Sequence, residues 1–328
     1  MRLAALRLLA CPGCGGYLEL KPSKDDPDGH VMEGTLRCDP CTRRFPITRG
    51  IPRLVDQPAS SAVATASRFS RQWQLFDDIA PHHRQQFLDW VKPLTPETFC
   101  GQTILEGGCG KGRHSRLLGD FGAADVLAID LGDSVEVAFR NTRTLPNVHI
   151  VQMDLMRPAI QAVFDLAISI GVLHHLPAPR EGFRGLLAAL RPGGRVVTWT
   201  YGLENNEWIV RWIDPVRKRI TSHLPAPVLL MLVTPPSLLL WGASKIVSHL
   251  GPMNASGISA YVAYIERLPL HEITTIVFDQ LTPTISHYLP RHEIQSWYSQ
   301  DSLEGVLISW HNQNSWRATG VWGAQALR

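Results

Sequence analysis

Apolar and polar positions alternate in blocks along the chain, and between residues 100 and 200 the blocks follow a strand, loop, helix order. Short apolar runs are predicted as strands at Thr103–Glu106, Asp125–Asp130, Val148–Met153, Phe164–Ile170 and Gly194–Tyr201. Stretches with helical spacing lie among them at Arg113–Leu118, at about Ser134–Thr142 and at Arg180–Leu190. This alternation predicts an α/β fold built on a doubly wound, mostly parallel sheet.

The segments on either side of this region have different patterns. Phe69–Val91 is aromatic and amphipathic enough for one or two helices, and the small, uncharged stretch Pro58–Ser67 is predicted as a linker. In the tail, Pro290–Tyr298 is predicted as a helix. We expect Gly305–Trp310 and Thr319–Trp322 to form an antiparallel pair that completes the sheet.

An insertion of roughly seventy residues separates the fifth strand from the tail. It opens with a basic, aromatic stretch, Trp208–Arg219, and is then uncharged from Ile220 to Ser244. Three interpretations are open: a helical lid over the active site, an interfacial membrane contact or lipid-binding cover, and a re-entrant or spanning segment. Pro235 and Pro236 divide the apolar run into halves too short to span a bilayer, which favours the lid.

Composition limits the classes of protein that fit. The chain has 328 residues, of which 45% are hydrophobic and 19% charged, and its net charge is +3. This length suits one large domain or two, and the apolar content argues against disorder of the whole chain. A charge of +3 is too small to indicate nucleic-acid binding by itself. We therefore do not expect nucleic acid as a partner.

Four of the six cysteines form two CxxC pairs near the N-terminus. Each pair presents two thiolates from one tight turn, and two such turns can close a tetrahedral metal site. The expected ligands of a structural zinc ion are Cys11, Cys14, Cys38 and Cys41. Such a small unit depends on its metal for stability, so we predict a zinc ribbon without a catalytic role.

The first residues also bear on location. Leu8-Leu9-Ala10-Cys11 loosely fits the signal that precedes a lipidated cysteine, but Arg7 interrupts the apolar run. We therefore expect a cytoplasmic protein. Peripheral membrane contact is expected, if anywhere, through residues 226–250.

The ribbon resembles a known family. Leu36-x-Cys-x-x-Cys is followed by Phe45-Pro46-Ile47 and then by Gly50-Ile51-Pro52. With the first CxxC pair, this series is similar to the small zinc-ribbon proteins that act as activating subunits of tRNA and protein methyltransferases. The resemblance covers about residues 1–56 and implies a ribbon that braces the domain after it.

A glycine loop follows the first predicted strand of the sheet. Gly108, Gly110 and Gly112 are spaced as GxGxG and follow the acidic residue Glu106. The dinucleotide-binding fingerprint GxGxxG requires a glycine where this chain has Arg113. The spacing therefore disfavours a dinucleotide cofactor.

Glu-Gly-Gly-Cys-Gly-Lys-Gly resembles the first motif of class I S-adenosylmethionine-dependent methyltransferases, and further motifs follow in order across residues 102–201. The resemblance implies a seven-stranded sheet in which Asp130 binds the ribose hydroxyls and Asp154 the adenine amino group. The cofactor-binding residues that it implies are Glu106, Gly108, Gly110, Gly112, Asp130, Leu131, Asp154, Leu155 and Gly171. Asp165 and Cys109 are interpreted as structural residues, and Lys111 as a solvated side chain.

In such enzymes the sulfonium already activates the methyl group, so the protein chiefly aligns the reactants and excludes water. A general base is optional. His174 and His175 follow the fourth strand and are the candidates for this role. The chain lacks the Asn/Asp-Pro-Pro-Tyr motif that amino methyltransferases present, which argues against DNA and exocyclic amines as acceptors.

These observations lead to a prediction for the whole chain. The expected divisions are a ribbon over 1–56, a linker with helices over 57–96, a methyltransferase core over 97–202 and 270–328, and a helical substrate lid over 203–269. The predicted function is methylation of an oxygen, nitrogen or carbon atom of a small molecule, with lipid-like and biosynthetic intermediates included. The alternatives are an RNA methyltransferase acting on rRNA or tRNA, and a non-catalytic binding or regulatory protein. The oligomeric state does not follow from the sequence.

Overall fold

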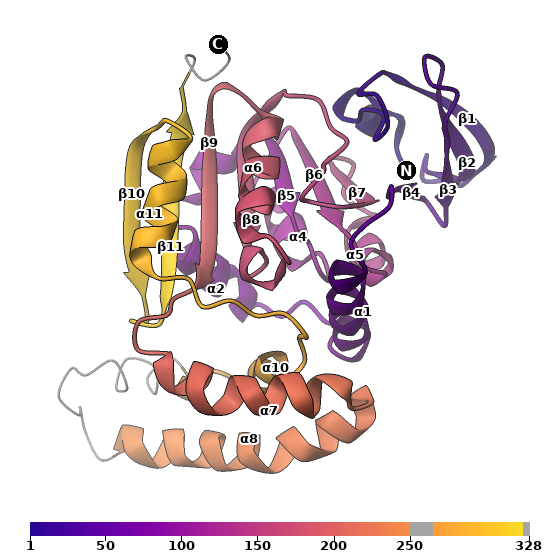
Figure 1. Cartoon of the computed structure of the whole chain (residues 1–328). Helices are drawn as coiled ribbons and strands as arrows, with labels where there is room; N and C mark the ends of the chain where they lie inside the picture. The colour runs from indigo at the N-terminus through magenta and orange to yellow at the C-terminus, as the bar shows by residue number, and fades with distance from the viewer. Residues whose placement is uncertain (250–264, 324–328) are drawn as a thin grey trace.

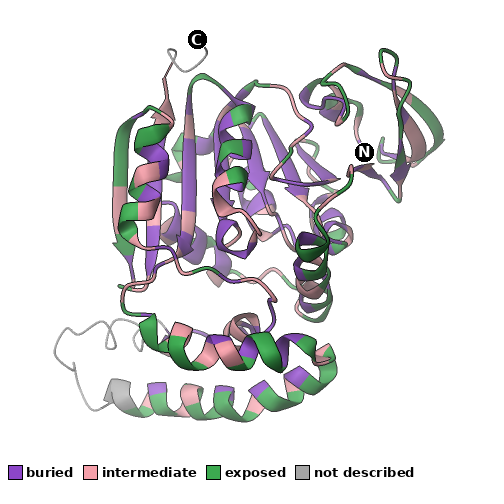
Figure 2. Ribbon diagram, in the orientation of Figure 1, coloured by how far each residue is buried: buried purple, intermediate pink, exposed green. Residues whose placement is uncertain are grey.

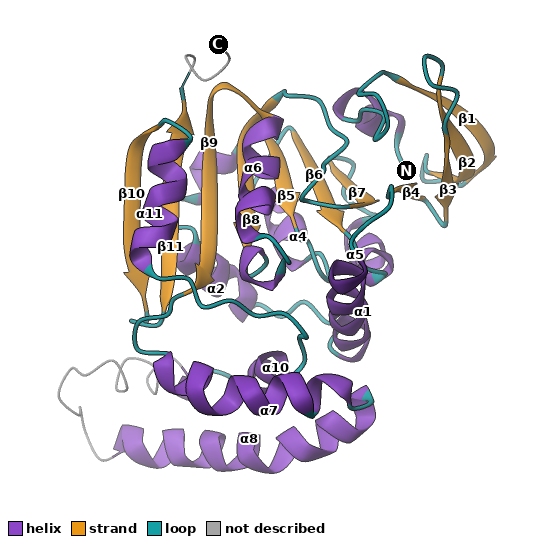
Figure 3. Cartoon of the chain, viewed as in Figure 1, coloured by secondary structure: helices purple, strands orange, loops and turns teal. Residues whose placement is uncertain are grey.

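A single mixed sheet runs through the molecule and carries helices on both faces (Figures 1 and 3). The computed structural model describes residues 1–249 and 265–323. The strand order is β1-β2-β3-β4-β7-β6-β5-β8-β9-β11-β10. Two hydrophobic cores lie against this sheet, one with α6 and α11 and the other with α2, α4 and α5.

Seven of these strands form the expected doubly wound unit. They are β5 Thr103–Gly107, β6 Asp125–Asp130, β7 Val148–Met153, β8 Phe164–Ile170, β9 Leu190–Tyr201, β10 Leu303–His311 and β11 Ser315–Trp322. The strands from β7 to β9 are parallel, and β11 is antiparallel to both β9 and β10. The helices around this unit are α2 His82–Trp90, α3 Pro96–Phe99, α4 Arg113–Asp120, α5 Ser134–Thr142, α6 Pro179–Ala189 and α11 Arg291–Gln300, with the short 3₁₀ helix η2 at Leu173–His175. The predicted fold class is confirmed.

The N-terminal unit extends the sheet to more than seven strands. It consists of η1 Leu3–Leu8, β1 Leu18–Asp25, β2 Val31–Cys38, β3 Arg44–Thr48 and β4 Ile51–Leu54. The four strands pair antiparallel in sequence order, and β4 then pairs parallel with β7 through Arg53↔Gln152 and Leu54↔Met153. Leu36 of this unit belongs to the same buried cluster as Met153. The two parts of the chain therefore share a sheet and a core.

The segment predicted as a linker is largely helical, so that prediction is wrong. Helix α1 begins at Ser60 and ends at Leu75. Its serines and threonines are weak helix formers in isolation, but packing of one face stabilises most helices in proteins. Here Ala62 and Thr65 are buried, and the Thr65 hydroxyl lies 2.6 Å from that of Thr284. Tertiary packing thus overrides the local composition.

The insertion after β9 folds into helices that lie across one end of the sheet (Figure 1). They are the π-helical turn η3 Ile209–Ile213, α7 Asp214–Arg219, the 3₁₀ turn η4 Thr221–His223 and α8 Ala226–His249, and α10 Leu270–Leu281 follows the insertion. Residues 250–264 of the predicted lid, and with them the last residue of the predicted membrane-contact segment, lie outside the described residues.

Helix α8 continues through Pro235 and Pro236, contrary to the expectation that these residues divide it. A proline removes the N–H that would bond to the carbonyl four residues earlier, here those of Met231 and Leu232. Both residues are more than half exposed, so water can satisfy their carbonyls. The free-energy cost of two prolines inside the helix is therefore reduced.

One side of α8 is exposed along the helix (Figure 2), and it carries large apolar side chains. Met231 and Leu239 are 76% and 75% exposed. Among the described residues, one helical stretch, Ala226–Ile246, is long and apolar enough to cross a bilayer by length and composition, and 17% of its most apolar window is buried. Length and composition of this kind are weak evidence of a membrane span.

Candidate functional site

A cavity of about 990 Å³ opens where the parallel strands end at their carboxyl termini. This volume lies near the upper limit of the roughly 300–1,000 Å³ typical of ligand sites. Residues from the ends of β5, β6, β7 and β8 line one side, and residues from α1, α8 and α10 line the other. In open α/β sheets ligands bind at this position.

The glycine loop after β5 forms the floor of the cavity. The Gly108 and Cys109 amides donate to the Ile129 carbonyl at 2.8 and 3.0 Å, which ties the loop to β6. Gly108 and Gly110 line the cavity and have φ values of +84° and +52°, a region that favours glycine. Gly112 does not line it, and a Cβ there would lie 3.0 Å from Ala138, so this glycine allows α4 and α5 to pack closely.

Two carboxylates at the ends of β6 and β7 face the cavity. Asp130 accepts hydrogen bonds from the amides of Gly110 and Gly132, both at 2.9 Å, which fixes its orientation. Asp154 accepts the Met156 amide with Oδ1, while its buried Oδ2 has no hydrogen-bond partner among the described residues. An unpaired buried acceptor fits a ligand donor such as the amino group of adenine. The residues present therefore fit an adenosyl cofactor.

The remaining predicted cofactor residues divide into two groups. Leu131, Leu155 and Gly171 line the cavity. Glu106 lies beneath the glycine loop, where it is 1% exposed and accepts a hydrogen bond from the Ser115 hydroxyl. Burial raises the pKa of Glu106 to about 8. In this structure Glu106 supports the loop from below, and its contact with a cofactor stays a prediction.

The two predicted base candidates lie in different surroundings. His175 lines the cavity, and its Nδ1 lies 2.9 Å from the Ile285 carbonyl, so Nε2 is the nitrogen left to accept a proton. His174 is fully buried outside the cavity lining, with its ring 4.0 Å from that of Tyr201. Burial lowers the pKa of His175 to about 3 and also lowers that of His174. Both rings are therefore neutral at pH 7.

Lys111 is 2% exposed, so its interpretation as a solvated side chain is wrong. Its ammonium donates to the Phe76 carbonyl at 2.9 Å and lies 5.4 Å from the centre of the Trp73 ring. Burial lowers the pKa of Lys111 to about 8. Trp73 at the end of helix α1 and Phe76 after it cover this side chain, and their packing over the glycine loop does not follow from a local pattern.

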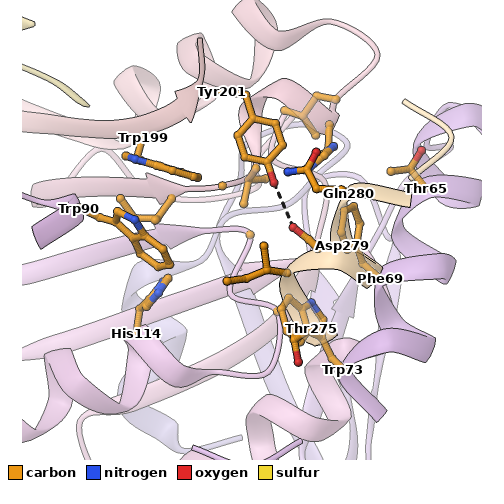
Figure 4. Close-up of a pocket in the computed structure, with 18 of the residues that line it drawn as sticks. Thr65, Phe69, Trp73, Trp90, His114, Trp199, Tyr201, Thr275, Asp279 and Gln280 are labelled. Carbon is orange, nitrogen blue, oxygen red and sulfur yellow. Dashed lines mark hydrogen bonds between the residues drawn. The ribbon is translucent and has the colours of Figure 1, made fainter. Parts of the chain in front are cut away.

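The sequence reasoning also missed a wall of the cavity. Thr65, Phe69 and Trp73 lie four residues apart on α1 and face the cavity together. Figure 4 shows them opposite Trp90 and Trp199. The four-residue spacing of these side chains was a detectable sign of one helical face. An aromatic lining of this kind suits a planar ligand.

A half-buried carboxylate from α10 completes the site. Asp279 accepts a hydrogen bond from the Tyr201 hydroxyl at 3.1 Å (Figure 4). It accepts a second one from the Gln72 amide at 3.2 Å. Burial raises the pKa of Asp279, and the two hydrogen bonds oppose that shift. Two residues after α10 lie nearby: Tyr288 lines the cavity, and the His287 amide donates to the His174 carbonyl at 2.8 Å. The site thus combines residues from β9, α1 and α10.

The four predicted metal ligands come together at the base of the N-terminal unit. Sγ of Cys11 lies 3.5 Å from that of Cys41, and Sγ of Cys14 lies 3.4 Å from that of Cys38. All four sulfur atoms lie within 4.8 Å of one another. A tetrahedral zinc site with Zn–S bonds of about 2.3 Å places its sulfurs roughly 3.8 Å apart. The arrangement therefore fits one zinc ion.

A second group of His and Glu side chains joins α2 to α10. The Ala80 amide donates to Nδ1 of His83 at 2.9 Å, so Nε2 of His83 carries the proton. This Nε2 lies 2.9 Å from Glu272, and His82 lies 3.3 Å from the same carboxylate. A protonated Nε2 cannot also bind a metal. We interpret the group as a hydrogen-bonded contact between the helices.

Two family profiles match the chain. The profile described as "Methyltransferase domain" matches residues 105–198. The profile described as "Trm112p-like protein" matches residues 2–50. The two matches cover the glycine loop with its parallel strands and the unit with the four cysteines.

The relatives show a recurring name. A tRNA U34 carboxymethyltransferase from Pseudoalteromonas translucida is 33% identical over 40% of this chain and 38% of its own length, and six further relatives carry the same name. A ubiquinone biosynthesis O-methyltransferase from Erwinia tasmaniensis is 28% identical over 43% of this chain and 60% of its own length. A structure of a putative S-adenosylmethionine-dependent methyltransferase from Listeria monocytogenes has 27% identity and a TM-score of 0.32, and the match covers 35% of this chain and 55% of that one. The match covers 33–38% of the length of the relatives named for tRNA.

These relatives correct two predictions. A small-molecule substrate was expected and nucleic acid was not, whereas the recurring relatives are named for tRNA. The net charge of +3 misled the prediction because the balance of a whole chain says nothing of where its charges lie. The profiles agree with the sheet, the loop and the cysteine cluster described above. The chain therefore carries a Trm112p-like domain followed by an S-adenosylmethionine-dependent methyltransferase domain.

Proposed function

We propose that this protein is an S-adenosylmethionine-dependent enzyme that modifies tRNA. The observation that carries the choice of tRNA is the recurring name among the relatives. The Trm112p-like domain supports the same class. The cavity supports it further, because it has room and aromatic walls for a base beside an adenosyl group.

The proposed cofactor contacts follow from the geometry of the loop and the two carboxylates. Asp130 would accept the ribose hydroxyls, Asp154 Oδ2 the adenine amino group, and the backbone at Gly108 and Gly110 would lie against the amino-acid part. When bound, the cofactor supplies a carbon group that is activated by its bond to a positively charged sulfur. The chain's own contribution is to align the acceptor with this group and to exclude water.

The acceptor atom must lose a proton when its new bond to carbon forms, while the sulfur keeps the electrons of the broken bond. Two groups in the cavity can take that proton, namely Nε2 of His175 and the carboxylate of Asp279. We favour Asp279, because burial lowers the pKa of His175 to about 3 and makes the ring a poor base, whereas it raises the pKa of Asp279. His175 then serves as a wall of the acceptor pocket.

For the N-terminal unit we propose one structural zinc ion held by its four cysteines. Closed sites with four cysteine ligands stabilise folds and leave no open position for catalysis. Because β4 pairs with β7, the metal would brace the sheet next to the strand that Asp154 follows.

The test of the main proposal is incorporation of label. The purified protein is incubated with total tRNA and S-adenosylmethionine that carries a labelled methyl group, in parallel with a lipid extract and a small-molecule extract. We expect label in tRNA, lost in the Asp130→Ala variant. Mass analysis of the modified nucleoside shows whether one methyl group has been added and to which nucleoside. Label confined to the lipid or small-molecule fraction, or label nowhere, would contradict the proposal.

The outward face of α8 suggests a separate proposal about location. The protein is proposed to act in the cytoplasm, with this apolar face in peripheral contact with a lipid surface. This face of α8 exposes Met231, Leu232 and Leu239. The basic residues Lys218 and Arg219 precede the helix, and such residues are attracted to anionic lipid. Sedimentation with vesicles that contain anionic lipid tests it, with Leu239→Glu as the variant expected to stay in solution. Equal sedimentation of both proteins, or of neither, would contradict it.

A further inference from the structure

The mouth of the cavity carries two loops that the proposed function leaves unassigned. One follows β9 and contains Asn205, Asn206 and Trp208, and the other joins β10 to β11 and contains Asn312 and Gln313. We propose that these loops bind a single unpaired nucleobase that is drawn out of an RNA loop. The proposal rests on the proposed tRNA function and names the part of the RNA that enters this site.

The two loops are fixed to each other by side-chain amides. The Asn206 amide donates to the carbonyls of Gly202 at 2.8 Å and Asn314 at 2.6 Å. The Asn205 amide donates to the carbonyl of Gln313 at 2.9 Å. The mouth is therefore a connected structure whose shape does not depend on a ligand.

Three residues of the mouth have positive φ values, namely +66° at Asn205, +48° at Asn312 and +53° at Gln313. At Asn312 and Gln313 this backbone is required by the tight turn between β10 and β11, in which the Asn314 amide donates to the His311 carbonyl at 3.2 Å. The turn places both residues in the lining of the cavity.

These two side chains are available to a ligand. Neither the Asn312 nor the Gln313 amide has a hydrogen-bond partner within residues 1–249 and 265–323. Each amide offers a donor and an acceptor side by side. Such a pair matches the donor and acceptor pattern on the pairing side of a nucleobase, which is how proteins read unpaired bases in RNA.

An aromatic residue, Trp208, follows Asn206 by two positions in the first of these loops. Trp208 lines the cavity and is 57% exposed, so a ring can stack on it from the solvent side. Stacking on aromatic side chains is the other common contact of unpaired bases. Trp212 lies one turn further along, is 64% exposed and does not line the cavity. It is therefore a matched control of the same residue type.

The position of the loops favours an extruded base over a double helix. Bases inside a duplex are stacked and paired, so an enzyme that acts on a base takes it out of the stack into a pocket. The mouth leads into a cavity walled by Phe69, Trp199 and Tyr201. A base held by Trp208 and the two amides would thus lie between solvent and the cofactor site.

The experiment compares the binding of two synthetic RNAs to the full chain by fluorescence anisotropy, with S-adenosylhomocysteine present. One RNA is a hairpin with a single-stranded loop, and the other is the same stem closed as a blunt duplex. We expect the hairpin to bind more tightly. Trp208→Ala should weaken hairpin binding about 5- to 100-fold, as loss of one stacked base does. Trp212→Ala should leave it within about twofold of the original protein.

A second variant tests the amides. Asn312→Gly with Gln313→Gly removes both side chains, and glycine accepts the left-handed backbone without strain. We expect this variant to lose hairpin binding while its affinity for S-adenosylhomocysteine and its melting temperature stay unchanged. Equal effects of Trp208→Ala and Trp212→Ala, or equal binding of hairpin and duplex, would overturn the inference.

The outcomes also separate this inference from the proposed function. The site assignment is wrong and the proposed function stands if the original protein transfers label to tRNA while Trp208→Ala and the double glycine variant bind the hairpin as tightly as the original protein does. If the original protein labels no RNA and does not bind the hairpin, the proposed function fails and the site assignment fails with it.

Discussion

The three carboxylates around the cavity have different hydrogen-bond partners. Asp130 is oriented by two backbone amides, Asp154 has one oxygen without a partner in the described part of the chain, and Asp279 is held by a tyrosine and a glutamine. Burial raises the pKa of Asp130 and of Asp279. A carboxylate that is partly withdrawn from water and has few donors is costly to ionise unless a ligand brings more. The site is thus prepared for ligands that donate hydrogen bonds.

Substitution of Asp130 tests the cofactor site. Asp130→Ala removes the carboxylate and leaves the Gly110 and Gly132 amides without their acceptor. A hydrogen bond to a charged group contributes roughly 1.5–3 kcal/mol, so we expect S-adenosylmethionine affinity to fall about 10- to 100-fold. Isothermal titration measures this change. Asp133→Ala, three residues along and exposed, is the control, and a similar loss in that variant would refute the assignment.

The ionisation of Asp279 makes the stability of the folded protein depend on pH. Because burial raises its pKa in the folded protein, the carboxylate lowers stability as pH rises above its ordinary pKa of 3.8, and the cost is complete above the raised value. Asp279→Asn removes that cost, so its melting temperature should exceed that of the original protein at pH 8. The difference should shrink as pH falls toward 3.8.

The same substitution, which should raise the melting temperature, should lower the activity. If Asp279 takes the proton, kcat of Asp279→Asn falls by about 10²-fold or more. Tyr201→Phe, which removes one hydrogen bond to the same carboxylate, should lower kcat less. Melting curves and kcat for both variants test this, and an unchanged kcat in Asp279→Asn would exclude the proposed role.

At the scale of the elements, the parallel strands could be predicted because their apolar runs are short and bounded by glycine or polar residues. Five predicted strands correspond to β5 to β9, and the predicted tail corresponds to α11, β10 and β11. The first part of helix α1 was missed because its serines and alanines look like a linker until its tertiary partners are known, whereas its last residues lie in the predicted helical segment Phe69–Val91. Helix α8 was divided in error because the effect of Pro235 depends on solvent access that no local pattern reveals.

In the candidate site, as in the fold, the sequence predicted the parts that depend on local motifs. The glycine loop and the acids of β6 and β7 follow from local motifs, and the four cysteines from their spacing. Lys111, Trp73 and Asp279 could not be placed, because their positions depend on α1 and α10 packing over the loop. Contacts between segments separated by many residues are absent from a local pattern.

The cysteine cluster gives a prediction at this scale. Cys38→Ser should lose the metal, since one thiolate of the four is removed, and the protein should melt at a lower temperature. Cys100→Ser is the control, because Cys100 is exposed and lies outside the cluster. Elemental analysis should give about one zinc per chain for the original protein and for Cys100→Ser. A folded, zinc-free protein of unchanged stability would contradict the assignment.

At the scale of the whole molecule, the N-terminal unit and the methyltransferase domain act as one body. They share the pairing of β4 with β7 and a hydrophobic core that contains Leu36, Leu54 and Met153. Elements that share a core unfold cooperatively. A chelator should therefore shift a single unfolding transition to lower temperature. Calorimetry checks this, and two separate transitions, with only one sensitive to the chelator, would contradict it.

The pairing of β4 with β7 also has a consequence for how the chain avoids aggregation. β7 has the sequence Val-His-Ile-Val-Gln-Met, and five of its six residues are buried. Without the N-terminal unit it would become an exposed edge strand, apolar and without a charged residue to discourage pairing with another chain. The cysteine unit thus serves as a cap on the sheet. A shortened chain that begins after residue 56 is then more prone to self-association through β7 than to independent folding.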